Sequence, residues 1–323
     1  MTRTRRAGAT LLFVLAAAVV CGPALVPHHA GQQFGDFGYA PPMRPRIVDA
    51  SGQWRRPFFY PFRLTNRLER RFEEDRRQPV PLRWFSGGVL VSGDGPAGPW
   101  LPFGADALGR DIFARVVMGA RLSLGVSFAA ALGALTIGAA VGAAAGFKGG
   151  RIDALLMGAA DLVLVLPAIY IVIVLRATMP LVLSTWEVFW TLTGVLAAAG
   201  WPYPARGVRA VVSAERAKEY AEAARALGAG PWRILLRHLM PATRRFLAVQ
   251  LTLLLPAFIL AEATLSFVGF GFAEPAPSWG VMLQEAAQSG GLVDAPWLMA
   301  PAAAIVITVL SLHLVADERA VSP

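Results

Sequence analysis

Six stretches of this 323-residue chain are apolar, nearly free of charge, and long enough to cross a lipid bilayer as helices. The hydrocarbon core of a bilayer is spanned by about 20 helical residues. The stretches cover residues 7–27, 122–147, 154–175, 188–205, 246–268 and 295–316. The pattern therefore predicts an all-α integral membrane protein with six transmembrane helices.

Small and charged residues inside these stretches indicate how the helices pack. In 122–147 a small residue recurs at every fourth position, which permits close approach of another helix in lipid. Asp161 and Glu262 are ionisable residues at membrane depth, where a charge facing lipid is costly. We expect both to face the bundle interior or an aqueous path, and they are candidate translocation-path residues; for Asp161 a structural role is the stronger expectation. The small residues are Ala130, Ala134, Gly138, Gly142 and Gly146.

The basic residues predict the orientation of the spans. They gather in residues 1–6, in the loop 148–151, and in 206–245, which contains nine of them. Because short basic loops stay on the cytoplasmic side, the N-terminus and both loops are predicted to be cytoplasmic, and six spans place the C-terminus there too. A cleaved signal peptide would begin similarly, but the first apolar run ends without a small-residue cleavage site, so we expect an uncleaved helix.

The predicted organisation has four parts. Residues 1–27 are a cytoplasmic N-terminus and the first helix, 28–118 a long periplasmic segment, 119–317 a five-helix domain with a loop at 206–245, and 318–323 a cytoplasmic tail. Residues 28–118 are rich in Arg, Pro, Gly and aromatics. Within them, the charged run 66–78 is predicted to be an exposed helix with charge pairs at i and i+4.

The composition agrees with a membrane protein. Of all residues 55% are hydrophobic and only 16% are charged, against about 25% charged in soluble domains. The net charge of +9 is explained in part by the basic loops, so no nucleic-acid partner is predicted. Cys21 is the only cysteine, which excludes an internal disulfide and a cysteine-based metal site.

The loop 206–245 contains a charged helix–turn–helix elbow. Residues 219–227 are good helix formers, Gly228 provides a break, and Pro231 is suited to open a second short helix that ends at Pro241. In the second helix an apolar stripe is predicted. An elbow of this kind suits docking onto a soluble partner. The stripe consists of Trp232, Leu235, Leu236 and Leu239.

The elbow resembles the EAA loop of ABC-transporter permeases. Glu222, Ala223 and Ala224, followed by Gly228 and Pro241, match its pattern E-A-A-x3-G with a distal L-P. His238 and Met240 stand where the pattern has Ile and Leu. The resemblance implies a cytoplasmic coupling helix that fits a groove on an ATPase subunit, with these five matching residues as its ATPase-coupling positions.

Three further segments resemble the dipeptide, oligopeptide and nickel permeases. Residues 103–111, FGADALGRD, are similar to their G-T-D-x-x-G-R-D segment, and residues 262–271 are similar to E-A-x-L-S-F-L-G-x-G. Residues 277–280 match P-S-W-G. The resemblance covers about two thirds of the chain and implies structural roles for the matching positions. These are Asp106, Gly109, Arg110, Asp111, Pro277, Ser278, Trp279 and Gly280.

The resemblance implies a permease subunit of a binding-protein-dependent importer in a bacterial inner membrane. Its partners would be a homologous second permease, two ATPase subunits that carry ATP and Mg, and a periplasmic substrate-binding protein. The chain itself would bind no cofactor, because its only lysines, Lys148 and Lys218, are not in a Walker A motif. Substrates would be di- or oligopeptides, with nickel or another small solute as the alternative.

Two other classes of function compete with a permease. An intramembrane hydrolase needs a nucleophile paired with a base, but the four histidines lie in loops or near span ends, so no catalytic residue is predicted. No His, Asp or Glu cluster has metal-ligand spacing. A proton-coupled secondary transporter could use Asp161 and Glu262 as a relay, but it would leave the elbow without a purpose.

Overall fold

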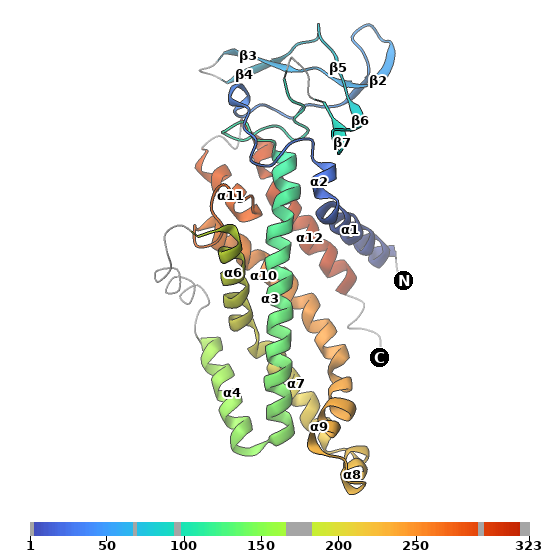
Figure 1. Cartoon of the computed structure of the whole chain (residues 1–323), viewed down its shortest axis with the longest axis vertical. Coiled ribbons are helices and arrows are strands. Elements are labelled where there is room, and N and C mark those ends of the chain that lie inside the picture. Colours follow the sequence, from blue (N-terminus) through green and yellow to red (C-terminus); the bar gives the residue numbers. More distant parts are fainter. Residues whose placement is uncertain (1–2, 67–69, 94–97, 166–182, 290–293, 317–323) are drawn as a thin grey trace. The chain divides into compact units, whose positions relative to one another are not determined.

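The computed structural model describes residues 3–66, 70–93, 98–165, 183–289 and 294–316 (Figure 1). The chain forms two compact units. Unit 1 comprises Met1–Gly8, Leu124–Glu262 and Ser311–Pro323, and unit 2 comprises Ala9–Ser123 and Ala263–Leu310.

Three helices in the described part of the chain are long and apolar enough to cross a membrane. They are Ile112–Lys148, Pro231–Phe267 and Pro296–Val315. The first is helix α3, which starts ten residues before the predicted span because Asp111 caps it there. At 37 residues it is about 55 Å long, well beyond a hydrocarbon core of about 30 Å.

The other predicted spans correspond to shorter described helices. Helix α1 (Arg3–Val20) is followed after Cys21 by the short helix α2 (Gly22–Leu25), so the first apolar helix ends earlier than predicted. Helices α4 (Gly150–Val165) and α6 (Thr185–Gly200) have 16 residues each. The rest of the predicted third span, 166–175, lies outside the described residues. The last predicted span is η4 (Pro296–Met299) followed by α12 (Ala300–Ala316).

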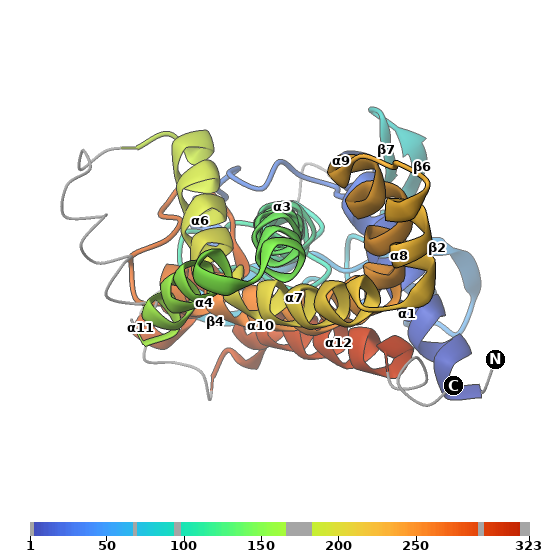
Figure 2. The ribbon, with the colours of Figure 1, turned by 90° about the horizontal axis from the view of Figure 1, so that it is seen from below.

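The small residues of α3 are where another helix packs, as predicted. Helix α7 (Pro202–Arg216) lies beside α3 in unit 1 (Figure 2). A Cβ added at Gly142 would stand 2.3 Å from the carbonyl oxygen of Ala205, and one at Gly146 would stand 2.6 Å from that of Arg209. Both distances are shorter than real Cβ contacts, so the two backbones approach each other as only glycine allows.

Helix α7 itself corrects the predicted end of the fourth span. Helix α6 ends at Gly200, before the predicted end at residue 205, and Pro202 occupies the first turn of α7, where its missing N–H has no partner to lose. Helix α7 then continues to Arg216 and carries the buried residues Val208 and Val212.

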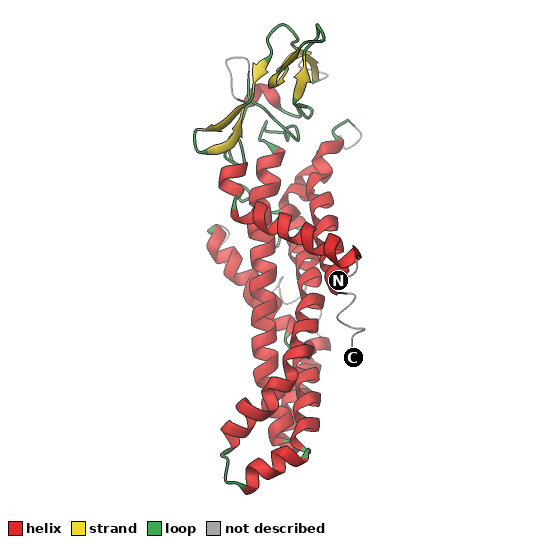
Figure 3. Cartoon of the chain, turned by 90° about the vertical axis from the view of Figure 1, so that its right-hand side faces the viewer, coloured by secondary structure: helices red, strands yellow, loops and turns green. Residues whose placement is uncertain are grey.

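The segment that precedes α3 contains β-strands, which the prediction of an all-α chain did not include (Figure 3). After the 3-10 turn η1 (Gly35–Phe37), three antiparallel strands pair in the order β1-β2-β5, and β3–β4 and β6–β7 form two hairpins. The core of this segment consists of buried residues that include Met43, Phe59 and Leu101. The strands are β1 (Arg46–Val48), β2 (Trp54–Phe59), β3 (Phe62–Asn66), β4 (Arg71–Glu74), β5 (Val80–Pro81), β6 (Arg83–Ser86) and β7 (Val89–Ser92).

The helix predicted over residues 66–78 is wrong. Described residues there form strand β4 and its flanks, with Phe62 paired opposite Glu74 in the β3–β4 hairpin. Phe72 packs edge to face on Phe62, with ring centroids 6.3 Å apart, and faces the core of the segment. Charge spacing favoured a helix, but in β4 half-buried and exposed residues alternate at the two-residue period of a strand, with Phe72 among the half-buried ones.

Candidate functional site

The elbow has two helices joined by a turn at Gly228, close to the prediction. Helix α8 (Glu219–Ala226) ends when Gly228 adopts a φ of +81°. The N–H of Gly228 donates to the carbonyl of Arg225 (2.9 Å), and that of Ala229 donates to the carbonyl of Ala224 (3.0 Å). These two bonds are the Schellman arrangement that closes a helix and favours glycine at this position.

The second half of the elbow differs from the prediction at Pro241. Helix α9 (Pro231–Ile234) passes into the π turn η2 (Leu235–Leu239), the 3-10 turn η3 (Met240–Thr243) and then α10 (Arg244–Phe267). Pro241 therefore does not end the helix. The N–H of Met240 reaches back five residues to Leu235, and that of Arg244 reaches back three residues to Pro241. This change of hydrogen-bond spacing accommodates the missing N–H of proline.

The elbow buries one side and exposes the other. Ala221, Ile234, Leu235 and Leu239 pack with Val208 and Val212 of α7 and Ala143 of α3 in one apolar cluster. The predicted stripe is thus divided: Leu235 and Leu239 are buried, whereas Trp232 is 73% and Leu236 62% exposed.

Leu227, in the turn, is 89% exposed, and Glu222 and Ala223 are exposed on α8. Exposed large apolar side chains in a segment predicted to lie outside the membrane are candidates for an interaction surface. We call Leu227, Trp232 and Leu236 the elbow face.

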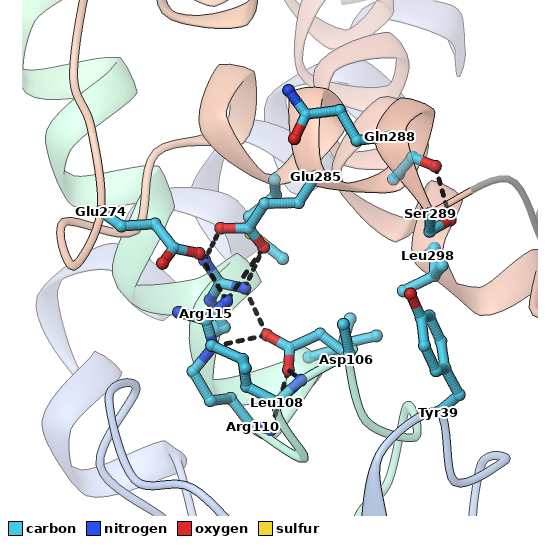
Figure 4. A pocket seen from close by; sticks show the side chains of 14 residues that line it. Tyr39, Asp106, Leu108, Arg110, Arg115, Glu274, Glu285, Gln288, Ser289 and Leu298 are labelled. Carbon is cyan, nitrogen blue, oxygen red and sulfur yellow. Dashed lines mark hydrogen bonds and ion pairs between the residues drawn. The ribbon is translucent and has the colours of Figure 1, made fainter.

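A second group of functional candidates is a cluster of charged residues in unit 2, here called the polar cluster (Figure 4). Asp106 is its centre. One carboxylate oxygen accepts from the backbone N–H groups of Leu108 (2.9 Å) and Arg110 (3.0 Å), and the other accepts from Arg110 Nε (2.6 Å) and from Arg115 (2.5 Å). Asp106 and Arg110, four residues apart, therefore form a local ion pair.

Two glutamates complete the polar cluster from a distant part of the chain. Arg115 donates both terminal nitrogens to the carboxylate of Glu285, at 2.5 and 2.7 Å, and Arg110 donates to Glu274 at 2.9 Å. Burial raises the pKa of Glu285, opposed by its bonds to Arg115. Arg115 is only 1% exposed, and buried charges persist only when paired in this manner. The sequence did not single out Arg115, Glu274 or Glu285.

Asp111 is buried beside the polar cluster but faces a different partner. Its Oδ1 accepts from the N–H of Phe113 (2.9 Å), which caps α3, and its Oδ2 lies 3.0 Å from His28 Nδ1. Burial raises the pKa of Asp111, and the bond to His28 opposes this shift. At Gly109 an added Cβ would lie 2.0 Å from the carbonyl oxygen of Phe34, so this turn requires glycine.

The segment 277–280 fixes helix α11 (Trp279–Gln288) to its neighbours in unit 2. Ser278 caps α11 by accepting from the N–H of Val281 at 3.2 Å. The buried Trp279 donates its backbone N–H to Ser123 Oγ (3.1 Å) and its indole N–H to the carbonyl of Val116 (3.0 Å).

The first and last residues of the segment 277–280 also lie close to neighbouring backbones. Pro277 presents its carbonyl oxygen 3.0 Å from where a Cβ would stand on Gly119, and a Cβ on Gly280 would lie 2.4 Å from the carbonyl oxygen of Ala263.

The two candidate translocation-path residues have different surroundings in unit 1. Asp161 of α4 is an ion-pair partner of Arg206 of α7, and the Asp161 side chain is 62% exposed. Glu262 of α10 is fully buried. The structure does not bring the two carboxylates together in any described contact. No group of three or more His, Cys, Asp or Glu residues suited to a metal ion occurs among the residues that the structure describes.

Comparison with known proteins gives a consistent result. Residues 134–317 match the family described as "Binding-protein-dependent transport system inner membrane component". The oligopeptide transport system permease protein OppC of Bacillus subtilis (strain 168) is 38% identical over 72% of this chain and 74% of its own. The dipeptide transport system permease protein DppC of the same strain is 39% identical over 67% of this chain and 65% of its own. OppC of Lactococcus lactis subsp. cremoris (strain SK11) is 32% identical over 67% and 74%.

Proposed function

We propose that this chain is the permease subunit of an ATP-driven importer of di- and oligopeptides. The chain belongs to the family of binding-protein-dependent transport system inner membrane components. The similar proteins from Bacillus and Lactococcus are oligopeptide and dipeptide permeases, which favours peptides over nickel. The chain would form the translocation path with a second, homologous permease. Six spans, with both termini and the elbow in the cytoplasm and residues 28–118 outside it, complete the proposal.

The observation that supports this function most directly is the elbow face. Leu227, Trp232 and Leu236 are large apolar side chains held exposed by a folded base that buries Ala221, Ile234 and Leu239. Exposed apolar side chains on a packed base suit insertion into a groove of a soluble partner. We propose that the partner is an ATPase subunit, with Glu222, Ala223, Ala224, Gly228 and Pro241 forming and shaping the contact.

Coupling would then follow from differential binding. If the ATPase pair closes on ATP, it moves the elbows that are seated in it, and the transmembrane bundle is biased from one conformation to another. The packing of the elbow on α7 and α3 transmits such a movement, because Leu235 and Leu239 share one apolar cluster with Val212 and Ala143. The chain itself carries no ATP site in this proposal; ATP and Mg belong to the partner.

Asp161 and Glu262 take different parts in the proposal. Because Asp161 pairs with Arg206, we expect it first to hold α4 against α7, and Asp161→Asn tests whether it has any role in the path. The fully buried Glu262 is proposed to support assembly of the bundle first and substrate choice second. Unchanged peptide uptake by Asp161→Asn would remove that residue from the path.

The experiment that tests the function uses the complete importer in proteoliposomes. Peptide uptake, ATP hydrolysis and co-purification of the ATPase are measured for a Leu227→Ser, Trp232→Ser double variant. We expect uptake and co-purification to fall at least tenfold, while membrane insertion is unchanged. The control is Phe85→Ser, which removes an 80% exposed aromatic side chain far from the elbow in sequence. Normal co-purification by the double variant would contradict the proposal.

Gly228 gives an independent test of the same contact. Nothing lies within 4 Å of a Cβ built there, but its φ of +81° strains any other residue. Gly228→Leu should therefore uncouple uptake from ATP hydrolysis by misplacing the turn, and Gly228→Asn should retain more activity because asparagine tolerates this conformation. Equal activity of the two variants would show that the turn geometry is irrelevant to coupling.

A further inference from the structure

The polar cluster lines one pocket of unit 2. A second pocket shares Tyr39 and Ser289 with the first. Its volume is about 440 Å³, within the range of small-ligand sites, about 300–1,000 Å³. Its lining includes three aromatic residues, here called its walls, and one exposed cation and one exposed anion, here called its rim. The residues that the argument uses are Tyr39, Phe72 and Trp297 in the walls and Arg70 and Asp294 at the rim.

The two rim charges are not neutralised by each other or by any neighbour in the part of the chain that the structure describes. The guanidinium of Arg70 stacks over the Tyr39 ring, 4.4 Å from its centroid. This contact leaves the hydrogen-bonding edge of the guanidinium available for a carboxylate. Asp294 and Arg70 are both exposed. The adjacent polar cluster has a different character, since its charges are paired and Asp106, Arg110 and Arg115 are buried.

The aromatic walls are held in place by contacts outside the pocket. The backbone N–H of Tyr39 donates to the carbonyl of Asp106 at 2.8 Å. The indole N–H of Trp297 donates to the carbonyl of Ala105 at 3.1 Å. Both anchors are on the turn that bears the polar cluster, so two walls are fixed to one rigid element.

The third wall and the cation come from the β3–β4 hairpin. Phe72 is held by its ring contact with Phe62, and Thr65 Oγ1 donates to the carbonyl of Arg71 at 3.0 Å. Arg70 itself has a φ of +50°, a conformation that is uncommon for a residue other than glycine and concentrates at functional sites. The hairpin thus places Arg70 on the pocket at the cost of local backbone strain.

We propose that this pocket is a contact site for the transported peptide, in which Asp294 takes the α-ammonium group and Arg70 the α-carboxylate. Tyr39, Phe72 and Trp297 contact the peptide side chains without demanding one sequence. A zwitterion matches one exposed cation and one exposed anion that line the same pocket as three aromatic residues. The proposal rests on the proposed function, because it takes peptides as the substrate.

The test measures peptide binding directly on the assembled complex of permeases and ATPases in nanodiscs, without the binding protein. The probe is a photoreactive tripeptide with free termini, and cross-linked positions are identified by mass spectrometry. We expect cross-links on this chain at Tyr39 or Trp297. Competing tripeptides with free termini, an acetylated N-terminus or an amidated C-terminus then report which terminus each residue recognises.

The variants should give a crossed pattern. Arg70→Gln should weaken competition by the free peptide about tenfold and leave the amidated peptide unchanged, because that peptide has already lost the carboxylate. Asp294→Asn should likewise weaken competition by the free peptide and leave the N-acetylated peptide unchanged, because that peptide has already lost the ammonium group. The matched controls are Arg71→Gln and Glu73→Gln, which alter exposed charges of the same hairpin that do not line the pocket.

Two results would overturn the proposal. One is the absence of cross-links at the pocket while the complete importer takes up peptide, which leaves the proposed function intact. The other is an equal loss for all three competitors in Arg70→Gln and Asp294→Asn, which would indicate a general effect on the complex. Failure of wild-type proteoliposomes to take up any peptide would instead refute the proposed function. If, in addition, no peptide competed with the photoreactive probe, the pocket proposal would be refuted as well.

Discussion

The interface between α3 and α7 in unit 1 and the polar cluster in unit 2 are both tightly packed, but different forces hold them. Along α3, Gly142 and Gly146 lie so close to α7 that an added Cβ would stand 2.3 and 2.6 Å from backbone oxygen atoms. In the polar cluster, side chains rather than backbones meet, and Arg115 bonds both Asp106 and Glu285.

The two regions therefore obtain their specificity in different ways. In lipid, apolar surface gains little by leaving its surroundings, so shape and van der Waals contact between backbones determine which helices pair. The polar cluster joins the turn before α3 to α11 by charges that are buried, and a misplaced partner would leave a charge without compensation. Packing tolerates no added volume in the first region, and the second tolerates no lost charge.

The largest effect is expected from removing a charge from the polar cluster. Arg115→Met removes one of the two cations that the buried Asp106 and the half-buried Glu285 share, Arg110 being the other. Loss of one partner of a buried pair costs up to about 3–5 kcal/mol of unfolding free energy. The control is Arg76→Met, whose partner Glu74 lies at 3.3 Å in an exposed pair, worth about 0–1 kcal/mol. Unfolding in mild detergent measures both. Similar losses in the two variants would mean that burial is not what makes the cluster strong.

A smaller effect is expected from adding one methyl group to the glycine interface. Gly142→Ala forces α3 away from Ala205, and overpacking of this kind costs about 1–3 kcal/mol. Gly158→Ala adds the same methyl to α4, where nothing lies within 4 Å, and the higher helix propensity of alanine should make it neutral or slightly stabilising. Thermal unfolding of the two variants gives the comparison; equal melting temperatures would contradict close backbone packing.

The smallest effect is expected from a single hydrogen bond near the polar cluster. Trp279→Phe removes the indole N–H that donates to Val116 at 3.0 Å and replaces the buried indole with a smaller ring. The lost hydrogen bond and the small cavity together should cost about 1–2 kcal/mol. A loss as large as that of Arg115→Met, measured in the same detergent, would show that ring shape and not bonding places α11.

The apolar helices follow from the amino-acid sequence alone, and so do the helix break and the helix start in the elbow. Spans around α3, α10 and α12 follow from uninterrupted hydrophobicity, and the four-residue spacing of glycine and alanine on α3 identified its packing face. The break at Gly228 and the start at Pro231 also follow from local chemistry, because each residue has few backbone options. These features depend on neighbours within a few residues.

Tertiary structure alone decided the strands and the polar cluster. Residues 66–78 carry a charge spacing that suits a helix, but β4 pairs with β3 in a hairpin and the half-buried Phe72 packs on Phe62. Arg115 and Glu285 are 170 residues apart in the chain, so no local pattern reveals their contact.

Pro241 was misjudged for a related reason. The π and 3-10 turns on either side of it absorb its missing hydrogen bond within the continuous helix. Sequence therefore fixes what each segment favours locally, whereas pairing between distant segments depends on the folded geometry that brings them together.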